Sequence, residues 1–442
     1  MRRSHAFAVV FLLACALPAG AQGFKTAASK PRPWSRVSFY TNTFRTSVAG
    51  LEPRLLSETI TAFSYQLPDS DENGADYGVD TRYSNYVQGT RPARTSIYEG
   101  FVGARLAGGR LRARVGHLWL QDVGALGSVA GGSVEFRQHR TSDTASRFRI
   151  GAFAGLEPNV LDTGYAAHVR KFGGFVAWDG NGANRSSLGY VAIKNGALME
   201  RSVLTTTNFL SLRRKVYIYQ AAEVNLEAPS GVARTGLSYL FTNARVTPVP
   251  RLELQGTYNR GRSIDARGLV DDVLSGRPIV QSAIDGLLYE SAGGRVTVEV
   301  VPRVRLYVGL SRDKNNRDTA ATRRFQVGGY ASNIRPFGLD LSASDSLMDR
   351  PTGSYHSTYV SLGRQLGRRL YLTGDYSTSL SVIRFSRSDG IVIETRPHTT
   401  RMSGTMTANV SRAWSLMTTV ERTAETGLQE LRGLAGLTYR IR

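Results

Sequence analysis

The feature that most constrains this chain is an alternation of side-chain character that recurs from residue 35 to the end. The segment 110–115 carries arginines at Arg110, Arg112 and Arg114 between Leu111, Ala113 and Val115, and Val304, Leu306, Val308 and Leu310 alternate with Arg303, Arg305 and Tyr307. Successive side chains of a strand point to opposite faces, so each segment has one apolar and one wet face. A soluble sandwich also alternates. So many segments with Arg and Tyr on the wet face favour a transmembrane β-barrel.

The number and spacing of these segments predict the size of the barrel. About 22 strand-like segments can be counted, and an all-β antiparallel barrel of about 18 to 22 strands is expected, with an even number so that both termini are periplasmic. Tight links such as 107–109, 302–303 and 367–368 predict periplasmic turns, and longer connections such as 261–289 and 347–354 predict extracellular loops. A β-propeller is the alternative soluble fold. The unequal spacing of similar segments disfavours it.

The N-terminus predicts export. Arg2 and Arg3 precede an apolar run, and Ala19-Gly20-Ala21 offers small residues for cleavage before Gln22. The predicted division is therefore a signal peptide at 1–21, a short periplasmic segment at 22–34 and the barrel at 35–442. The apolar run is shorter than the roughly 20 residues that a membrane-spanning helix needs. The single cysteine, Cys15, lies in a faint lipoprotein-type sequence, which leaves a lipid-anchored form as the alternative.

The C-terminal strand carries a family resemblance. Residues 436–441 read Gly-Leu-Thr-Tyr-Arg-Ile, with a glycine followed by an aromatic and an apolar residue two positions apart. This resembles the final-strand signal of the bacterial outer-membrane β-barrel (porin-like) superfamily, although Arg442 stands where that signal usually ends in an aromatic residue. The resemblance covers only this strand and names no single family. It implies the outer membrane of a Gram-negative-type bacterium, with membrane lipid and the barrel-assembly machinery as partners.

The positive charge of the chain predicts a basic lumen. The formal net charge is +21, but the arginines are spread at strand period instead of gathered in a helix or arm, which disfavours nucleic acid as a partner. A lipid-facing arginine costs about 2 to 4 kcal/mol at the bilayer centre, so mid-strand arginines are expected inside. The predicted basic rows are Arg110, Arg112, Arg114, Arg147, Arg149, Arg303 and Arg305. Rings of arginine select anions. The alternative is a periplasmic rim position, beside lipid phosphates, Glu253 or Glu299.

The connection 261–289 mixes acidic and apolar residues. Its acidic members are Asp265, Asp271, Asp272 and Asp285. This mixture is too apolar for a loop wholly in solvent. Two placements stay open: a constriction loop folded into the lumen opposite the basic wall, or a small helical cap on the extracellular rim.

One segment has the ligand spacing of a calcium loop. Asp69, Asp71 and Asn73 precede the turn residue Gly74, and Asp80 stands at the twelfth place. The closing residue is Asp where Glu is usual, and the flanking segments predict strands, so an ordinary solvated turn is the alternative. No other cofactor is expected.

Nothing in the sequence predicts an enzyme. The histidines are scattered, and the neighbours His356 and Ser357 would point to opposite faces of a strand, so they cannot form a base and nucleophile pair. The expected function is an outer-membrane channel for small hydrophilic, anionic solutes. Two alternatives stay open: a barrel for export of an anionic exopolymer and a barrel hydrolase. The oligomeric state is not predicted.

Overall fold

The structure is a computed structural model, and it describes residues 34–441 except 68–70, 88–90, 140–145, 160–162, 181–183, 214, 228–235, 264, 279–285 and 387–390. The predicted signal peptide at 1–21 and nearly all of the predicted segment at 22–34 lie outside the described residues. The first strand begins at Trp34, one residue before the predicted start of the barrel.

The described residues form strands, one short 3-10 helix and one α-helix. The first half comprises β1 (Trp34–Val48), β2 (Arg54–Gln66), β3 (Gly74–Tyr86), β4 (Arg94–Leu106), β5 (Leu111–Trp119), η1 (Gln121–Leu126), β6 (Ser128–Arg137), β7 (Arg147–Pro158), β8 (Tyr165–Asp179), β9 (Arg185–Asn195), β10 (Leu198–Leu212) and β11 (Val216–Glu227). The second half comprises β12 (Gly236–Val249), β13 (Leu252–Ser263), α1 (Ala266–Leu274), β14 (Leu287–Val301), β15 (Val304–Asn315), β16 (Thr322–Ile334), β17 (Leu339–Arg350), β18 (Gly353–Leu366), β19 (Leu370–Ser386), β20 (Val392–Thr395), β21 (His398–Ala408), β22 (Trp414–Glu425) and β23 (Leu428–Ile441).

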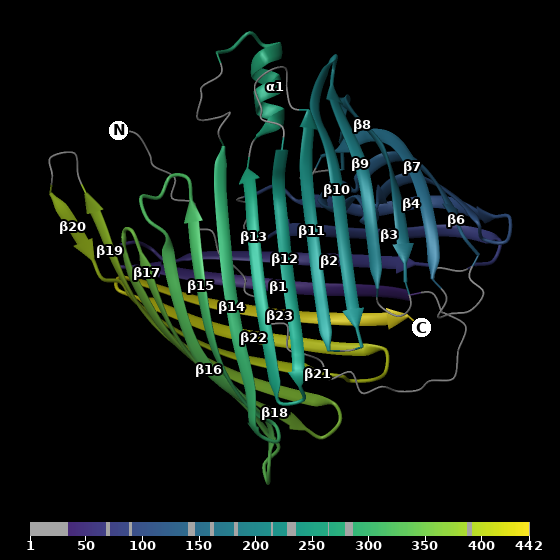
Figure 1. Ribbon diagram of the computed structural model, residues 1–442. Coiled ribbons are helices and arrows are strands. Elements are labelled where there is room, and N and C mark those ends of the chain that lie inside the picture. Colours follow the sequence, from purple (N-terminus) through teal and green to yellow (C-terminus); the bar gives the residue numbers. More distant parts are fainter. Residues whose placement is uncertain are drawn as a thin grey trace.

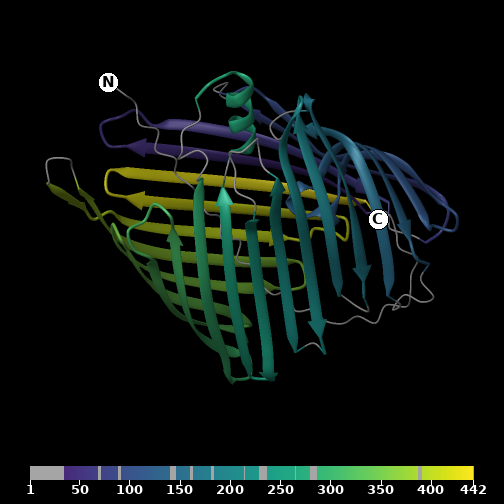
Figure 2. The same ribbon diagram turned by 45° about the horizontal axis from the view of Figure 1, so that its top comes forward.

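The strands close into one antiparallel barrel. Each strand pairs with the next along the chain, and β1 pairs with β23 from Ser35↔Ile441 to Val48↔Leu428. β20 and β21 both pair with β19, so they form one interrupted barrel strand, and the 23 strands of the described residues occupy 22 positions. The near and far walls cross steeply, as tilted strands on opposite sides of a barrel do (Figures 1 and 2). The predicted fold class is confirmed.

The register separates the two faces of the wall. Leu306, Val308 and Leu310 share one face of β15 and are 51%, 45% and 63% exposed. Their register partners on β16 include Val327 and Phe325, which are also exposed. This face carries the large exposed apolar side chains around the barrel and therefore faces outward, as in an outer-membrane-type transmembrane β-barrel. No helix among the described residues is long and apolar enough to cross a membrane.

The end of the barrel at which β1 begins and β23 ends has an aromatic girdle. Trp414 and Tyr439 contact each other there, with ring centroids 4.6 Å apart, and Tyr65 and Tyr77 stack at 5.6 Å. Aromatic girdles mark membrane interfaces in such barrels, and both termini of bacterial barrels are periplasmic. We therefore refer to this end as periplasmic and to the opposite end, above which α1 stands in Figure 1, as extracellular.

The lumen is partly filled on the side formed by β4 to β9. The β5–β6 hairpin is short, and its connection, η1, folds inward to contact β8, β9 and β10. Buried apolar side chains beneath it include Leu118, Val123, Val129 and Val191, each 0% exposed. The barrel thus contains a small apolar core inside its wall.

Candidate pore constriction

The carboxylate of Asp122 anchors the inward loop η1 to the barrel wall. Asp122 lies in η1 and is 5% exposed. It accepts hydrogen bonds from Arg149 on β7, at 2.9 Å to each carboxylate oxygen, and from Arg185 on β9 at 2.7 Å. Both arginines lie near the periplasmic ends of their strands. The loop is therefore tied to the inner wall in the periplasmic part of the lumen.

Arg149 is the centre of a buried ionic network. Its Nε donates to Asp179 Oδ2 at 2.8 Å, Nη1 donates to Asp122 and Glu135, and Nη2 donates to Asp122 and Asp179. All five guanidinium N–H groups thus have carboxylate acceptors, which is the full donor capacity of arginine. The arginine itself is only 5% exposed. Removing each charge from water costs several kcal/mol of desolvation free energy. In this network the ion pairs and the fully used donors of Arg149 offset that cost.

Further ion pairs extend the network along the inner wall. Arg137 donates to Glu135 at 3.0 Å, and Arg147 donates to Asp71 at 3.0 Å and to Asp179 at 3.4 Å. Arg112 makes a two-point contact with the buried Asp76 of β3. The partners come from β3, β5, β6, β7, β8 and β9 as well as from the turn at Asp71. The network therefore fixes this inner wall and η1 as one unit.

The charges of the network nearly cancel. Its seven arginines are Arg105, Arg112, Arg114, Arg137, Arg147, Arg149 and Arg185, and its six carboxylates are Asp71, Asp76, Glu99, Asp122, Glu135 and Asp179. The formal sum of seven positive and six negative charges is +1. All of these groups except Arg105, Asp71 and Asp76 line a cavity of about 240 Å³. The cavity therefore has a strong local electric field but only a small net charge.

The same loop also packs by apolar contact. A Cβ atom at Gly189 of β9 would lie 2.6 Å from Val123 Cγ1, so only glycine lets the wall and η1 approach this closely. Nearby, Lys171 is 1% exposed and donates to the backbone oxygen of Ser128 at 2.9 Å, and it lies 2.8 Å from Glu157. The loop is thus held by both burial and charge.

A wider cavity lies on the other side of η1. It has a volume of about 630 Å³ and separates η1 from the inner face of β10 to β14. Tyr219, Tyr239 and Tyr289 line it together with Thr205 and Thr207. Their hydroxyl groups and aromatic rings offer hydrogen bonds and stacking to polar solutes. Arg201, Glu223 and Arg262 also line the cavity, and Arg201 pairs with Glu223 at 3.1 Å. This cavity is the candidate passage beside the loop.

The predicted basic residues fall into two groups. Arg112, Arg114, Arg147 and Arg149 lie on the inner face, and Arg114 stands 5.4 Å above the ring of Phe101. Most of them are paired with carboxylates instead of surrounded by water, because η1 and the neighbouring strands bring acidic residues to the same place. The other three, Arg110, Arg303 and Arg305, lie at or next to periplasmic turns, and Arg305 donates to Glu299 at 3.0 Å.

The predicted calcium ligands are directed to different partners. Asp71 pairs with Arg147, Asn73 accepts from the backbone N–H of Gly108 at 2.7 Å, and Asp80 accepts from Ser64 at 3.0 Å. Asp69 lies outside the described residues. Within the described residues, no group of three or more His, Cys, Asp or Glu side chains is placed to hold a metal ion.

The acidic residues of the 261–289 connection surround α1 at the extracellular end. Asp265 caps the helix by accepting from the backbone N–H of Gly268 at 2.9 Å, Asp271 accepts from Asn195 at 3.0 Å, and Asp272 pairs with Arg277 at 2.8 Å. Asp285 lies outside the described residues. The helix is tied to the β9–β10 hairpin, and the segment that enters the lumen is η1 instead.

Sequence reasoning missed the acidic half of the constriction. Glu135 and Asp179 lie at inward positions of β6 and β8, so strand parity could have placed them opposite the arginines. Asp122 could not have been found in this way, because it lies in the connection η1 and not at an alternating strand position.

Comparisons with known proteins assign no family to this chain. No protein-family model matches this chain, and no curated protein matches it. Among solved structures, it is similar to OccAB4 of Acinetobacter baumannii, at 9% identity and a TM-score of 0.45 over 93% of this chain and 98% of that one. It is also similar to OpdQ of Pseudomonas aeruginosa, at 8% identity and 0.43 over 93% and 100%, and to the translocation pore of the P pilus usher PapC, at 11% identity and 0.43 over 92% and 100%. The assignment of this chain as a transmembrane β-barrel rests on its closed strand pairing and apolar outer face.

Proposed function

We propose that this protein is a channel for small hydrophilic solutes in the outer membrane of a Gram-negative-type bacterium. The observation that carries the proposal is the inward position of η1 in a closed barrel. A loop that is folded into the lumen narrows the passage while the rest of the barrel stays wide. The remaining passage, lined by tyrosines and threonines, suits small polar solutes better than a polymer. This argues against the export of an exopolymer.

A planar-bilayer recording tests the channel. Purified protein inserted into a lipid bilayer is expected to give stepwise, ohmic conductance without any added protein. Absence of conductance in a preparation that resists unfolding in detergent would contradict the proposal.

Steady conductance would also separate a channel from a barrel hydrolase. His356 and Ser357 have opposite strand parity, with His356 bound to Asp345 on the outer face, so they offer no hydrolytic pair.

We further propose a weak preference for anions. The buried network contributes a net charge of about +1, and Arg295 and Arg324 face the lumen from the opposite wall without an ion pair among the described residues. Arg295 instead stacks on Tyr307, 3.6 Å from the ring centroid. Asp313 lies on the same inner face, so the expected preference is small. A reversal potential under a potassium chloride gradient measures it, and a cation-selective parent channel would contradict it.

The C-terminal strand is proposed to be the segment that the barrel-assembly machinery recognises. β23 ends at Ile441 and forms the closing pair with β1. Substitution of Tyr439 by Ser, which removes the girdle contact with Trp414, is expected to reduce the amount of barrel in the outer membrane. An unchanged amount would contradict this role.

A further inference from the structure

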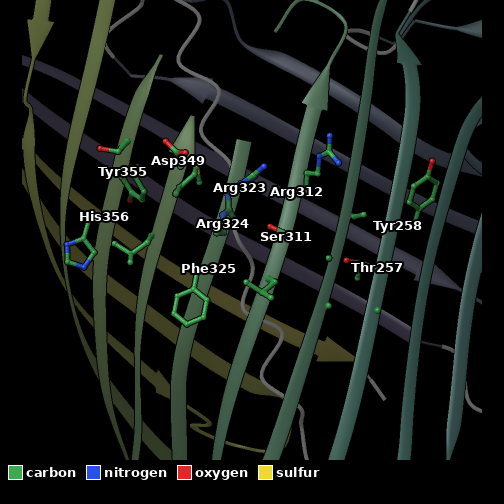
Figure 3. A pocket seen from close by; sticks show the side chains of 18 of the residues that line it. Thr257, Tyr258, Ser311, Arg312, Arg323, Arg324, Phe325, Asp349, Tyr355 and His356 are labelled. Atoms are coloured by element: carbon green, nitrogen blue, oxygen red, sulfur yellow. The ribbon is translucent and has the colours of Figure 1, made fainter. Parts of the chain in front are cut away.

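The outer face of the barrel has a hollow that the channel does not use. A cavity of about 960 Å³ crosses the wall from β12 to β19 (Figure 3). Its floor is a row of register partners, Ala244, Gly256, Gly294, Leu310, Phe325 and Leu347. Leu310 and Phe325 are 63% and 41% exposed, so these side chains face lipid. The hollow is wide and almost entirely apolar along this row.

The next row toward the extracellular end is polar. Arg312 of β15 and Arg323 of β16 are direct register partners and point outward beside Tyr258 and Ser354. Both arginines are exposed, and neither forms an ion pair or hydrogen bond with a side chain of the described residues. In Figure 3 they lie above Phe325, on the extracellular side of the apolar floor. The hollow therefore has an apolar floor and a cationic edge.

The arginine pair is unfavourable by itself. Like charges directly opposite on neighbouring strands repel each other, and a charge near the hydrocarbon boundary needs a partner. Asp349, the register partner of Arg323, supplies only one negative charge. A phosphate group between the two guanidinium groups would satisfy both, because guanidinium binds phosphate through paired hydrogen bonds.

We propose that this hollow binds a phosphorylated, acylated glycolipid of the outer leaflet. Its acyl chains lie on the floor between Gly256 and Phe325, and its phosphate contacts Arg312 and Arg323. The order of the two rows carries the choice of ligand, since the cations stand at the extracellular edge and the apolar surface lies beneath them. A soluble anion would leave the apolar floor without a contact. A purely apolar partner would leave the charges of the two arginines uncompensated.

The test measures lipid retained by the purified full-length protein, with native mass spectrometry in detergent and diphosphorylated lipid A as the probe. The double variant Arg312→Gln, Arg323→Gln is expected to bind about tenfold more weakly, because two charge-assisted contacts are lost. Dephosphorylated lipid A should bind the parent as weakly as lipid A binds this variant. The matched control is Arg45→Gln, Arg422→Gln, which removes two exposed, outward arginines of β1 and β22 far from the hollow. Equal losses in both variants would overturn the proposal.

A second variant tests the floor without changing charge. The double variant Gly256→Leu, Gly294→Leu fills the hollow, and the backbone tolerates it, since a Cβ at Gly256 meets nothing within 4 Å and one at Gly294 meets only Gln255 O at 3.9 Å. Weaker lipid binding with unchanged thermal stability supports the proposal. Unchanged lipid binding overturns it. A parent that is dimeric in lipid-free detergent and becomes monomeric through this variant would also overturn it, because a second copy would then cover the hollow.

Discussion

The two sides of the lumen use the same kinds of ion pair in opposite ways. On the side of β4 to β9, the side chains of Arg149 and Glu135 are 6% and 4% exposed, and several carboxylates share each arginine. On the side of β14 to β22, pairs such as Arg305 with Glu299 are 41% and 22% exposed and mostly isolated. The comparison indicates that η1 excludes water from one part of the inner wall. Each buried charge there is stabilised by the oppositely charged side chains around it instead of by water.

The largest effect should come from the centre of the buried network. Arg149→Met removes five hydrogen bonds and leaves Asp122, Glu135 and Asp179 short of compensation, and breaking a buried pair from one side costs about 3 to 5 kcal/mol. We expect a clear loss of resistance to heat and denaturant, measured by the shift from folded to unfolded mobility on a gel. Arg401→Met, at a half-exposed site on β21, is the matched control. Equal losses in both variants would mean that the two sides do not differ.

The next effect concerns the width of the passage. Replacement of residues 121–126 by a shorter Gly-Ser link removes Asp122 and Val123, which hold η1 inside the lumen. Single-channel conductance should rise severalfold, because the inward loop no longer occupies the lumen. Truncation of the extracellular helix α1 provides the control and should leave conductance nearly unchanged. If α1 controls conductance and η1 does not, the constriction has been assigned to the wrong loop.

The third effect concerns the ion selectivity of the channel. The balance of positive and negative charges in the buried network determines whether the channel prefers anions or cations. Replacing Arg112, Arg114, Arg147 and Arg149 by Gln leaves three arginines against six carboxylates, so the formal local charge becomes −3. The reversal potential should move toward cation preference, most strongly in dilute salt, where the Debye length exceeds about 10 Å. Replacement of Arg303 and Arg305 at the periplasmic turns should move it less. An unchanged reversal potential would show that the network lies away from the conducting path.

The sequence predicted the barrel well because alternation is a local property. Each strand needs only its own pattern to define which residues face lipid, and the C-terminal segment 436–441, which was predicted to be the final strand, lies within β23. Two contacts of the constriction join residues that are far apart in the sequence. The contact between Asp122 and Arg149 joins residues 27 positions apart through a loop that enters the lumen, and the pairing of Arg147 with Asp71 spans 76 positions. No periodicity encodes such contacts. The arginines were therefore predicted to be hydrated, whereas the structure surrounds most of them with carboxylates.

The smallest effect should appear at the exposed pair of Arg305 and Glu299. A double-mutant cycle with Arg305→Gln and Glu299→Gln isolates the coupling between the two charges, which lie 3.0 Å apart. Both groups are reached by water, so the expected coupling free energy is below about 1 kcal/mol and should fall further in high salt. Arg305 also donates to Tyr330 at 3.2 Å, so Tyr330→Phe is needed to separate that bond from the ion pair. Unfolding midpoints in urea and detergent supply the measurement. A coupling as large as the effect of Arg149→Met would mean that water does not reach this wall, and the contrast between the two sides of the lumen would disappear.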